Sequence, residues 1–284
     1  MSPAKLSIGQ CATLACLLEV TAPKPGNVHR GADFEDLTFS DFAASAVAIA
    51  PAMDGALESG VGTAVLTAAQ ATRSLVNTNT NLGTVLLLAP LSAVPPGTKL
   101  DTGVAQIIKG LTASDTRQVY EAIRIANPGG MGEVDSMDLA ETPPDNLLAA
   151  MRHAASRDLV ARQYATDFSE VFGVAATGIV RGVDKGWRLM DAIVHTHVKL
   201  MSQFPDSLIA RKYGDETVYR SAELASHVLE AGEPGDEDYH CSLSDLDFWL
   251  RSDHHRRNPG TTADLIAAGL FVLLRDEIIQ PPYR

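Results

Sequence analysis

Two cations lie near the N-terminus on a short segment that prolines hold outside a helix. Pro23 and Pro25 flank Lys24, and proline both fixes its own φ and disfavours helix at the residue before it. Gly26 allows a turn or a close backbone approach, and Arg30 adds the second charge. Cations on a stiff loop suit phosphate oxygens, so we predict a phosphate-binding loop. An ordinary Pro-Gly connector with solvated charges is the alternative.

A second candidate segment combines glycines with two acids. Glu133 and Asp135 follow Gly129, Gly130 and Gly132. Such a loop can wrap a ligand and offers oxygens that suit Mg²⁺ or the proton of a hydroxyl group. A plain helix C-cap followed by surface acids is the alternative.

Two further aspartates lie at expected helix starts. Asp206 follows Pro205 and could bind a metal ion or serve as a helix N-cap. Arg211 and Lys212, one turn later, could bind phosphate or form a solvated face. Asp264 lies three residues after Thr261, which is the spacing of a capping box. The same helix start could bind phosphate through its amides while Asp264 binds a cation, and both interpretations can hold together.

Composition limits the partners. The 284 residues carry a net charge of -12 with an isoelectric point near 5.0, which disfavours nucleic acid and anionic membranes as partners. An anionic ligand must therefore be met by local cations or by a metal. The three cysteines show no CxxC spacing, and no apolar run is long enough to span a bilayer. With no leader pattern at the start, these features predict a cytoplasmic protein.

The elements that must position these residues are helical. Apolar residues recur at helical spacing along most of the chain, and no long run alternates with period two. We predict an all-α fold of around ten helices in a single domain, residues 1–284, with Pro51 kinking or dividing its helix. The expected helices are 3–21, 39–58, 61–76, 82–93, 114–126, 143–163, 167–183, 186–203, 214–231, 244–256 and 262–279.

The motifs in their order resemble those of the triphosphoribosyl-dephospho-CoA synthase family. The resemblance covers about residues 10–275 and rests on PKPGNVHR, DFEDL, NTNTNLG, GGMGE, PDS and NPGTTADL. Members of that family are all-helical. They transfer the ribosyl 5′-triphosphate of ATP to a hydroxyl of 3′-dephospho-CoA and release adenine, forming the precursor of the prosthetic group of certain acyl carrier proteins.

The chain departs from the family pattern mainly at cations. Asn81 and Leu82 replace a His-Lys pair, Phe34 and Glu35 replace another His-Lys pair, and Met131 replaces an arginine. His29 stands at an aspartate position. Each lost cation removes charge-assisted hydrogen bonds of roughly 1.5–3 kcal/mol. Nine positions match the family pattern: Lys24, Gly26, Arg30, Asp36, Asn79, Gly83, Glu133, Asp206 and Asp264. Asp135 stands where the family has a glutamate.

The resemblance implies a transferase that acts on ATP and a nucleotide-like acceptor and depends on Mg²⁺. In this interpretation Asp206 and Asp264 hold the metal ion, and Glu133, Asp36 or Asp135 takes the acceptor proton. Phosphates would be bound by Lys24 and Arg30, and the nucleoside by Asn79, Asn81 and the backbone at Gly83 and Gly26. Arg211 and Lys212 join the phosphate candidates from the local pattern after Asp206 and not from the resemblance. Two alternatives remain at this point: a ribosyl or phosphoribosyl transferase with another acceptor, and a non-catalytic nucleotide-binding protein. A homo-oligomer is also compatible with the sequence.

Overall fold

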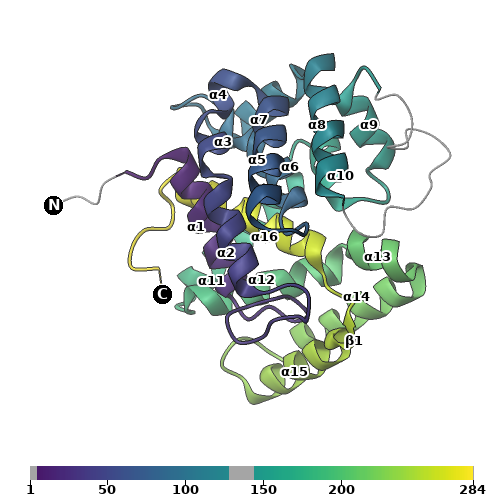
Figure 1. The fold of residues 1–284 in the computed structure, drawn as a ribbon. Coiled ribbons are helices and arrows are strands. Elements are labelled where there is room, and N and C mark those ends of the chain that lie inside the picture. The colour runs from purple at the N-terminus through teal and green to yellow at the C-terminus, as the bar shows by residue number, and fades with distance from the viewer. Residues whose placement is uncertain (1–4, 128–143, 284) are drawn as a thin grey trace.

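Helices form nearly all regular structure in this computed structural model, which describes residues 5–127 and 144–283 (Figure 1). The first half contains α1 (Ile8–Thr21), α2 (Phe39–Ala48), α3 (Ala50–Asp54), α4 (Ala56–Ser59), α5 (Val61–Leu75), α6 (Leu82–Ser92), α7 (Leu100–Lys109) and α8 (Ala113–Ala126). The second half contains α9 (Leu147–Ala154), α10 (Leu159–Ala165), the π-helix η1 (Val171–Ala176), α11 (Thr177–Asp184), α12 (Leu189–Gln203), α13 (Ser207–Tyr213), α14 (Asp215–Glu230), α15 (Glu237–Arg251), the short strand β1 (Ser252–His255) and α16 (Gly260–Arg275).

The helical class is confirmed, but the predicted number of helices is too low. Pro51 falls in the first turn of α3, so the predicted helix 39–58 is divided into α2, α3 and α4. The predicted helix 143–163 is also divided, because Asp158 caps a new start at α10 with a 2.9 Å bond from the amide of Ala161. Helix α7 and strand β1 were not predicted, and α13 was expected only as a helix start at Asp206.

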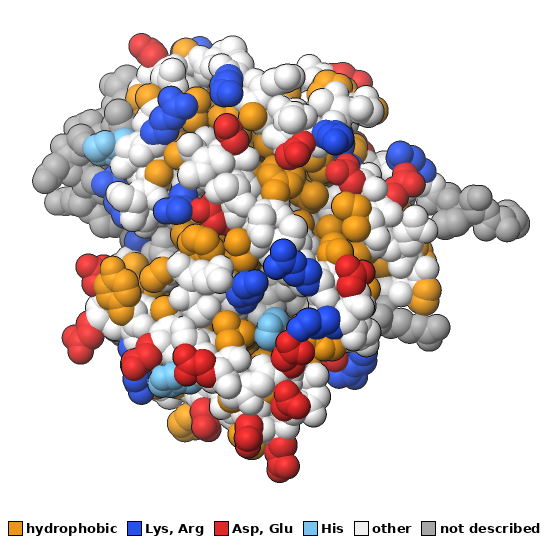
Figure 2. Space-filling view, turned by 180° about the vertical axis from the view of Figure 1, so that it is seen from behind, with side chains coloured by type: hydrophobic (Ala, Val, Ile, Leu, Met, Phe, Trp, Pro, Cys, Tyr) orange, Lys and Arg blue, Asp and Glu red, His pale blue; other side chains and the backbone are white. Residues whose placement is uncertain are grey.

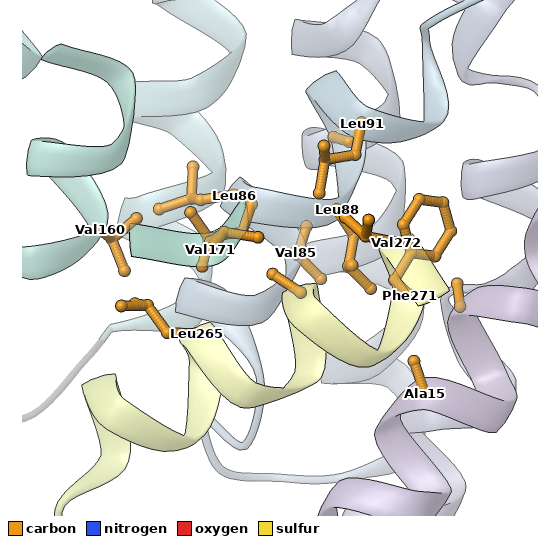
Figure 3. Packing of buried hydrophobic residues seen from close by; sticks show 14 of the residues in the cluster. Ala15, Val85, Leu86, Leu88, Leu91, Val160, Val171, Leu265, Phe271 and Val272 are labelled. Carbon is orange, nitrogen blue, oxygen red and sulfur yellow. The ribbon is translucent and has the colours of Figure 1, made fainter. Parts of the chain in front are cut away.

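Two helices that are apolar on all sides form the centre of the main core. Helix α16 is buried at every position from Leu265 to Leu274, and α6 at every position from Thr84 to Ser92. A helix that is hydrophobic all round is stable only inside a protein. Figure 3 shows Phe271 and Val272 of α16 beside Leu88 of α6, and Leu265 of α16 beside Val160 of α10. Burying each such side chain contributes about 1.5–3 kcal/mol.

A second, smaller hydrophobic cluster lies among α12–α15. Its buried members include Val198, Ile209, Val218, Tyr239 and Leu250. In the sequence this cluster follows most of the residues that form the main core. This cluster supports α13, and α13 in turn contacts α16.

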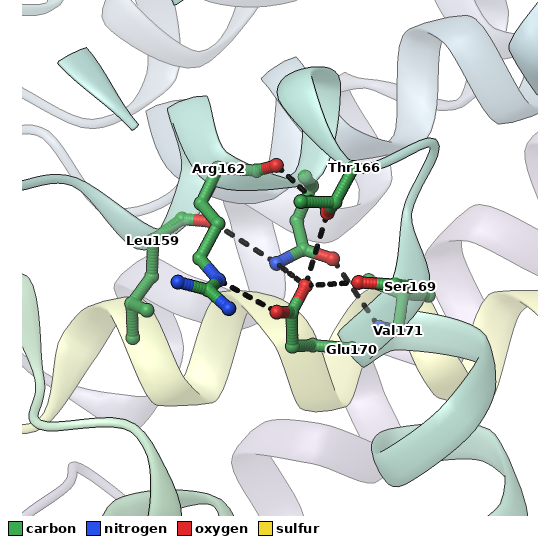
Figure 4. A network of polar contacts seen from close by, with 7 residues as sticks. Leu159, Arg162, Thr166, Ser169, Glu170 and Val171 are labelled. Atoms are coloured by element: carbon green, nitrogen blue, oxygen red, sulfur yellow. Dashed lines mark hydrogen bonds and ion pairs between the residues drawn. The ribbon is translucent and has the colours of Figure 1, made fainter. Parts of the chain in front are cut away.

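A buried carboxylate fastens α10 to the helix that begins with η1 (Figure 4). Glu170 accepts hydrogen bonds from Arg162 Nε at 2.6 Å, Gln163 Nε2 at 3.0 Å and Ser169 Oγ at 2.8 Å. Burial alone would raise the pKa of Glu170, but these donors outweigh it and lower the pKa. The network fixes the turn between two helices that both contact α16.

The described surface carries mixed charge. Figure 2 shows Lys and Arg side chains interspersed with acidic ones, and acidic side chains gathered along the lower edge of that face. Among residues 5–127 and 144–283, no helix has the length and apolarity needed to cross a membrane.

Candidate active site

A cavity of about 720 Å³ lies where α1, α2, α6, α8, α9, α10, α13 and α16 approach one another. Its walls are apolar on α2, α8 and α9, and polar where α6, α10, α13 and α16 begin. A volume of this size suits a nucleotide-sized ligand. The charged and amide side chains that line it are Glu19, Asn27, Asp36, Asn79, Asn81, Asn127, Arg157, Asp158, Arg211, Lys212, Asn258 and Asp264.

Asp264 and Gly83 meet at the inner wall of the cavity. Thr84 Oγ1 donates a 2.6 Å hydrogen bond to Asp264 Oδ1, and the other carboxyl oxygen lies against Gly83. A β-carbon at Gly83 would lie 2.6 Å from the carboxyl carbon of Asp264, so only glycine permits this approach. Burial, partly offset by Thr84, raises the pKa of Asp264 to about 8, and the nearby Glu19 contributes to the rise.

The two predicted asparagines also lie in the cavity. Asn79 Oδ1 accepts the amide of Leu82 at 3.1 Å and so caps the first turn of α6. Asn81 is buried, and its Oδ1 accepts the hydroxyl of Thr72 at 3.3 Å. Its Nδ2 has no hydrogen-bond partner within the described part of the chain. Because buried donors are normally paired, this amide is available to a ligand in the cavity.

One wall of the cavity is cationic. Arg211 and Lys212 come from α13, and Arg211 forms an ion pair with Asp158 at the start of α10. Burial lowers the pKa of Lys212, and Arg211 lowers it further. An anionic ligand beside these two side chains would offset the repulsion between their charges, so this wall favours phosphate.

Lys24 does not face the cavity, contrary to our interpretation of its loop. It is fully buried, and its Nζ donates to Glu19 Oε1 at 2.8 Å, to the carbonyl of Glu19 at 2.5 Å and to the carbonyl of Ala22 at 3.4 Å. An ammonium group has three donors, and all three are used inside the protein. The predicted phosphate contact therefore does not fit this geometry.

The other two loop residues also lie outside the cavity lining. Gly26 has a φ of +74°, and its amide donates to Asp247 Oδ1 at 2.7 Å. A β-carbon at Gly26 would lie 2.8 Å from that of Leu250, which confirms the predicted close backbone approach. Arg30 is exposed.

Asp206 connects two helix starts. Its Oδ1 accepts the amides of Leu208 at 2.9 Å and Ile209 at 3.2 Å, which confirms the N-cap interpretation for α13. Its Oδ2 accepts the amide and the hydroxyl of Thr262, both at 2.7 Å. The side chain is buried and does not line the cavity. The metal-binding interpretation of Asp206 does not fit this arrangement.

The capping box predicted from Thr261 and Asp264 is absent at the start of α16, whose N-cap residue is Pro259. Thr262 instead bonds to Asp206, and Asp264 bonds to Thr84. Tertiary partners thus replace the local ones that the spacing indicated.

Comparison with known proteins places this chain in a family. The model of the ATP:dephospho-CoA triphosphoribosyl transferase family matches residues 5–281. The chain belongs to this family. It is therefore an enzyme with triphosphoribosyl-dephospho-CoA synthase activity, and ATP and dephospho-CoA are the substrates of ATP:dephospho-CoA triphosphoribosyl transferases.

A solved structure has the same fold as this transferase. A proposed triphosphoribosyl-dephospho-CoA synthase from Archaeoglobus fulgidus is 24% identical, with a TM-score of 0.62 over 85% of this chain and 99% of the other. No match was found among curated proteins. At this identity the likeness supports the helical architecture and not the individual site residues.

The structure brings together many of the site residues predicted for this transferase. Asp36, at the exposed rim, joins the cavity with six others: Asn79, Asn81, Gly83, Arg211, Lys212 and Asp264. Lys24, Gly26, Arg30 and Asp206 support the surroundings and do not line it. Glu133 and Asp135 lie outside the described residues.

Sequence reasoning missed several lining residues of this transferase, above all Glu19. Glu19 lies in the apolar helix α1, is only 8% exposed and still lines the cavity. An acid among apolar residues, five positions before a lysine, was the available signal. Arg157, Asp158 and Asn258 lie at helix junctions, and no local pattern marked them.

The described residues contain no group of three or more His, Cys, Asp or Glu side chains arranged to hold a metal ion. Asp264 does fit a shared role in cation binding, because its Oδ2 has no hydrogen-bond partner among those residues. Mg²⁺ commonly binds through one or two carboxylates together with substrate phosphates.

Proposed function

We propose that the cavity described above is where the ribosyl triphosphate of ATP passes to the hydroxyl of dephospho-CoA. One observation carries the proposal: Asp36, Asn79, Gly83 and Asp264 match family motifs far apart in the sequence and line a single cavity. Side chains that serve only local structure would have no reason to converge in this way.

The wall with Arg211 and Lys212 suits the triphosphate. Guanidinium and ammonium groups bind phosphate oxygens through charge-assisted hydrogen bonds. Asn79 and Asn81 lie at the start of α6 and suit the nucleoside, with the free Nδ2 of Asn81 as donor. Asn81 and Leu82 are uncharged where the family has a His-Lys pair, so Arg211 and Lys212 carry more of the phosphate binding.

Mg²⁺ is proposed to enter with the triphosphate. Asp264 would hold it through the carboxyl oxygen beside Gly83, and Asp206 would act only by fixing the start of α16. The ion would neutralise phosphate charge. A bound cation favours the ionised carboxylate, so its binding would release the proton that Asp264 otherwise holds.

A ribosyl carbon that loses its base develops positive charge, which nearby carboxylates stabilise. Asp36, Glu133 and Asp135 remain candidates for the acceptor proton. The cytoplasm is the proposed compartment, consistent with a biosynthetic enzyme that uses ATP.

The test is adenine release. Pure protein is incubated with ATP, dephospho-CoA and Mg²⁺, and free adenine is quantified by chromatography. Release that requires dephospho-CoA supports the proposal. Release that is independent of dephospho-CoA would indicate another acceptor, and ATP binding without turnover on any acceptor would indicate a nucleotide-binding protein.

A further inference from the structure

The charged pair formed by Glu19 and Lys24 lies between the core and the cavity. Lys24 has no exposed surface. Glu19, five residues earlier in the sequence, contributes to the cavity lining. Their 2.8 Å contact is the only ion pair that either residue forms in residues 5–127 and 144–283. The acid is therefore the member of the pair that lines the cavity, and its side chain keeps 11% of its surface exposed while the lysine keeps none.

The geometry points to Glu19 as the carboxylate that takes the proton of the acceptor hydroxyl, and to Lys24 as the positioning residue that holds it there. This inference rests on the proposed function and adds a residue to it. Neither the motif resemblance nor the predicted site included Glu19.

A stability role alone is a weak explanation for such a pair. Taking two charges out of water is costly, and apolar residues of similar volume often stabilise a protein as well or better. The desolvation cost is explained if the carboxylate must be ionised and held in one position beside a reacting group. Glu19 meets that condition because it borders the cavity.

Lys24 is better suited to positioning than to phosphate binding. Its second and third donors go to the carbonyls of Glu19 and Ala22, at the end of α1. These bonds tie the ammonium to the same turn that carries Glu19. Pro23 and Pro25 flank Lys24 and stiffen the loop, so the cation cannot readily leave the carboxylate.

Glu19 also has a suitable neighbour across the cavity. Asp264 feels the charge of Glu19, and this repulsion adds to the effect of burial in raising the pKa of Asp264. The thiol of Cys16 on α1 also has a raised pKa, first because of burial and then because of Glu19. Among residues 5–127 and 144–283, Lys24 is the cation that forms an ion pair with Glu19.

The proposed step transfers the ribosyl group from adenine to the acceptor oxygen. The acceptor oxygen bonds to the anomeric carbon while the bond from that carbon to adenine breaks, and the electron pair leaves with adenine. The hydroxyl proton passes to the Glu19 carboxylate. Adenine takes up one proton from the surroundings, and Glu19 later releases its own to solvent, so no proton is gained or lost overall.

Glu19→Gln and Lys24→Met test the inference in the full-length protein. General-base catalysis contributes about 100-fold or more, so we expect Glu19→Gln to lower the kcat of dephospho-CoA-dependent adenine release by at least that factor. The Kd for ATP, measured by calorimetry with Mg²⁺, should stay within about threefold. Glu121→Gln, at an exposed position on α8 away from the cavity, is the matched control.

Lys24→Met separates positioning from phosphate binding. A positioning role predicts a lower kcat with an unchanged Kd for ATP, because the Glu19 carboxylate loses the contact that holds it in place. A phosphate contact predicts instead a weaker Kd for ATP, which would overturn the assignment of Lys24.

The double variant Glu19→Gln/Lys24→Met guards against misfolding, since it leaves no unpaired buried charge. If it folds and retains near wild-type kcat, Glu19 is not the base. Failure of the proposed function gives a different result. In that case the wild-type protein itself shows no adenine release that depends on dephospho-CoA, and the assignment of Glu19 is then wrong as well.

Discussion

Gly83 on α6 and Asp264 on α16 lie so close that no β-carbon fits between them. The two residues are 181 positions apart in the sequence, and their contact brings the starts of two core helices together at the wall of the cavity. Asp264 keeps its position because Gly83 leaves room for it and Thr84 binds it.

Gly83→Ala should displace the Asp264 carboxyl. We expect adenine release to fall about 100-fold, because a small misplacement of a reacting or binding group has effects of that order. Kinetics with ATP and dephospho-CoA measure the change. Gly173→Ala in η1 is the control, since a β-carbon there meets no atom within 4 Å. Equal activity of both variants would show that the contact has no bearing on the reaction.

Asp206→Asn should act on stability. The amide nitrogen cannot accept either bond from Thr262. The Thr262 hydroxyl can rotate and accept instead, but the buried Thr262 backbone amide loses its partner at a cost of about 1–3 kcal/mol. Urea unfolding measures the loss, with exposed Asp245→Asn on α15 as the control. The Mg²⁺ concentration for half-maximal rate should not change. A shift in that concentration without loss of stability would restore Asp206 as a metal ligand.

Lys212→Met should weaken ATP binding. Loss of one charge-assisted bond to phosphate predicts a rise of about 10-fold in the KM for ATP. Lys109→Met removes an exposed lysine from α7 and serves as the control. An unchanged KM in the Lys212 variant would mean that the triphosphate lies against another wall.

Asp264 should make folding depend on pH. Its pKa is raised to about 8 in the folded protein, mainly by burial, from about 4 in the unfolded chain. The folded state then holds a proton that the unfolded state releases, so the contribution of Asp264 to stability is greatest below pH 4 and falls as the pH rises towards 8.

Asp264→Asn cannot ionise and still offers an oxygen to Thr84. The variant should therefore gain stability relative to the wild type as pH rises from about 4 to 8, reaching on the order of 5 kcal/mol if the whole shift of about four pKa units is realised. Denaturant unfolding across this range checks the trend. A constant difference at every pH would contradict the raised pKa.

Local patterns in the sequence determined the helical class, most helix positions and the motif set of the family. The recurrence of apolar residues at helical spacing and the division of a helix at Pro51 depend on residues close together in the sequence, so both can be predicted from it. The cap at Asp206 was readable for the same reason, because Ser207 begins a helix directly after it.

Only the tertiary structure decided which charged groups face the ligand. Lys24 and Asp264 both follow or begin apolar helices, yet packing turns Lys24 inward to Glu19 and leaves Asp264 at the cavity. The direction of a side chain depends on contacts with residues distant in sequence, such as Gly83 with Asp264, and no local spacing encodes them. The proline-flanked lysine thus marks the site, while the carboxylate that it supports carries the proposed chemistry.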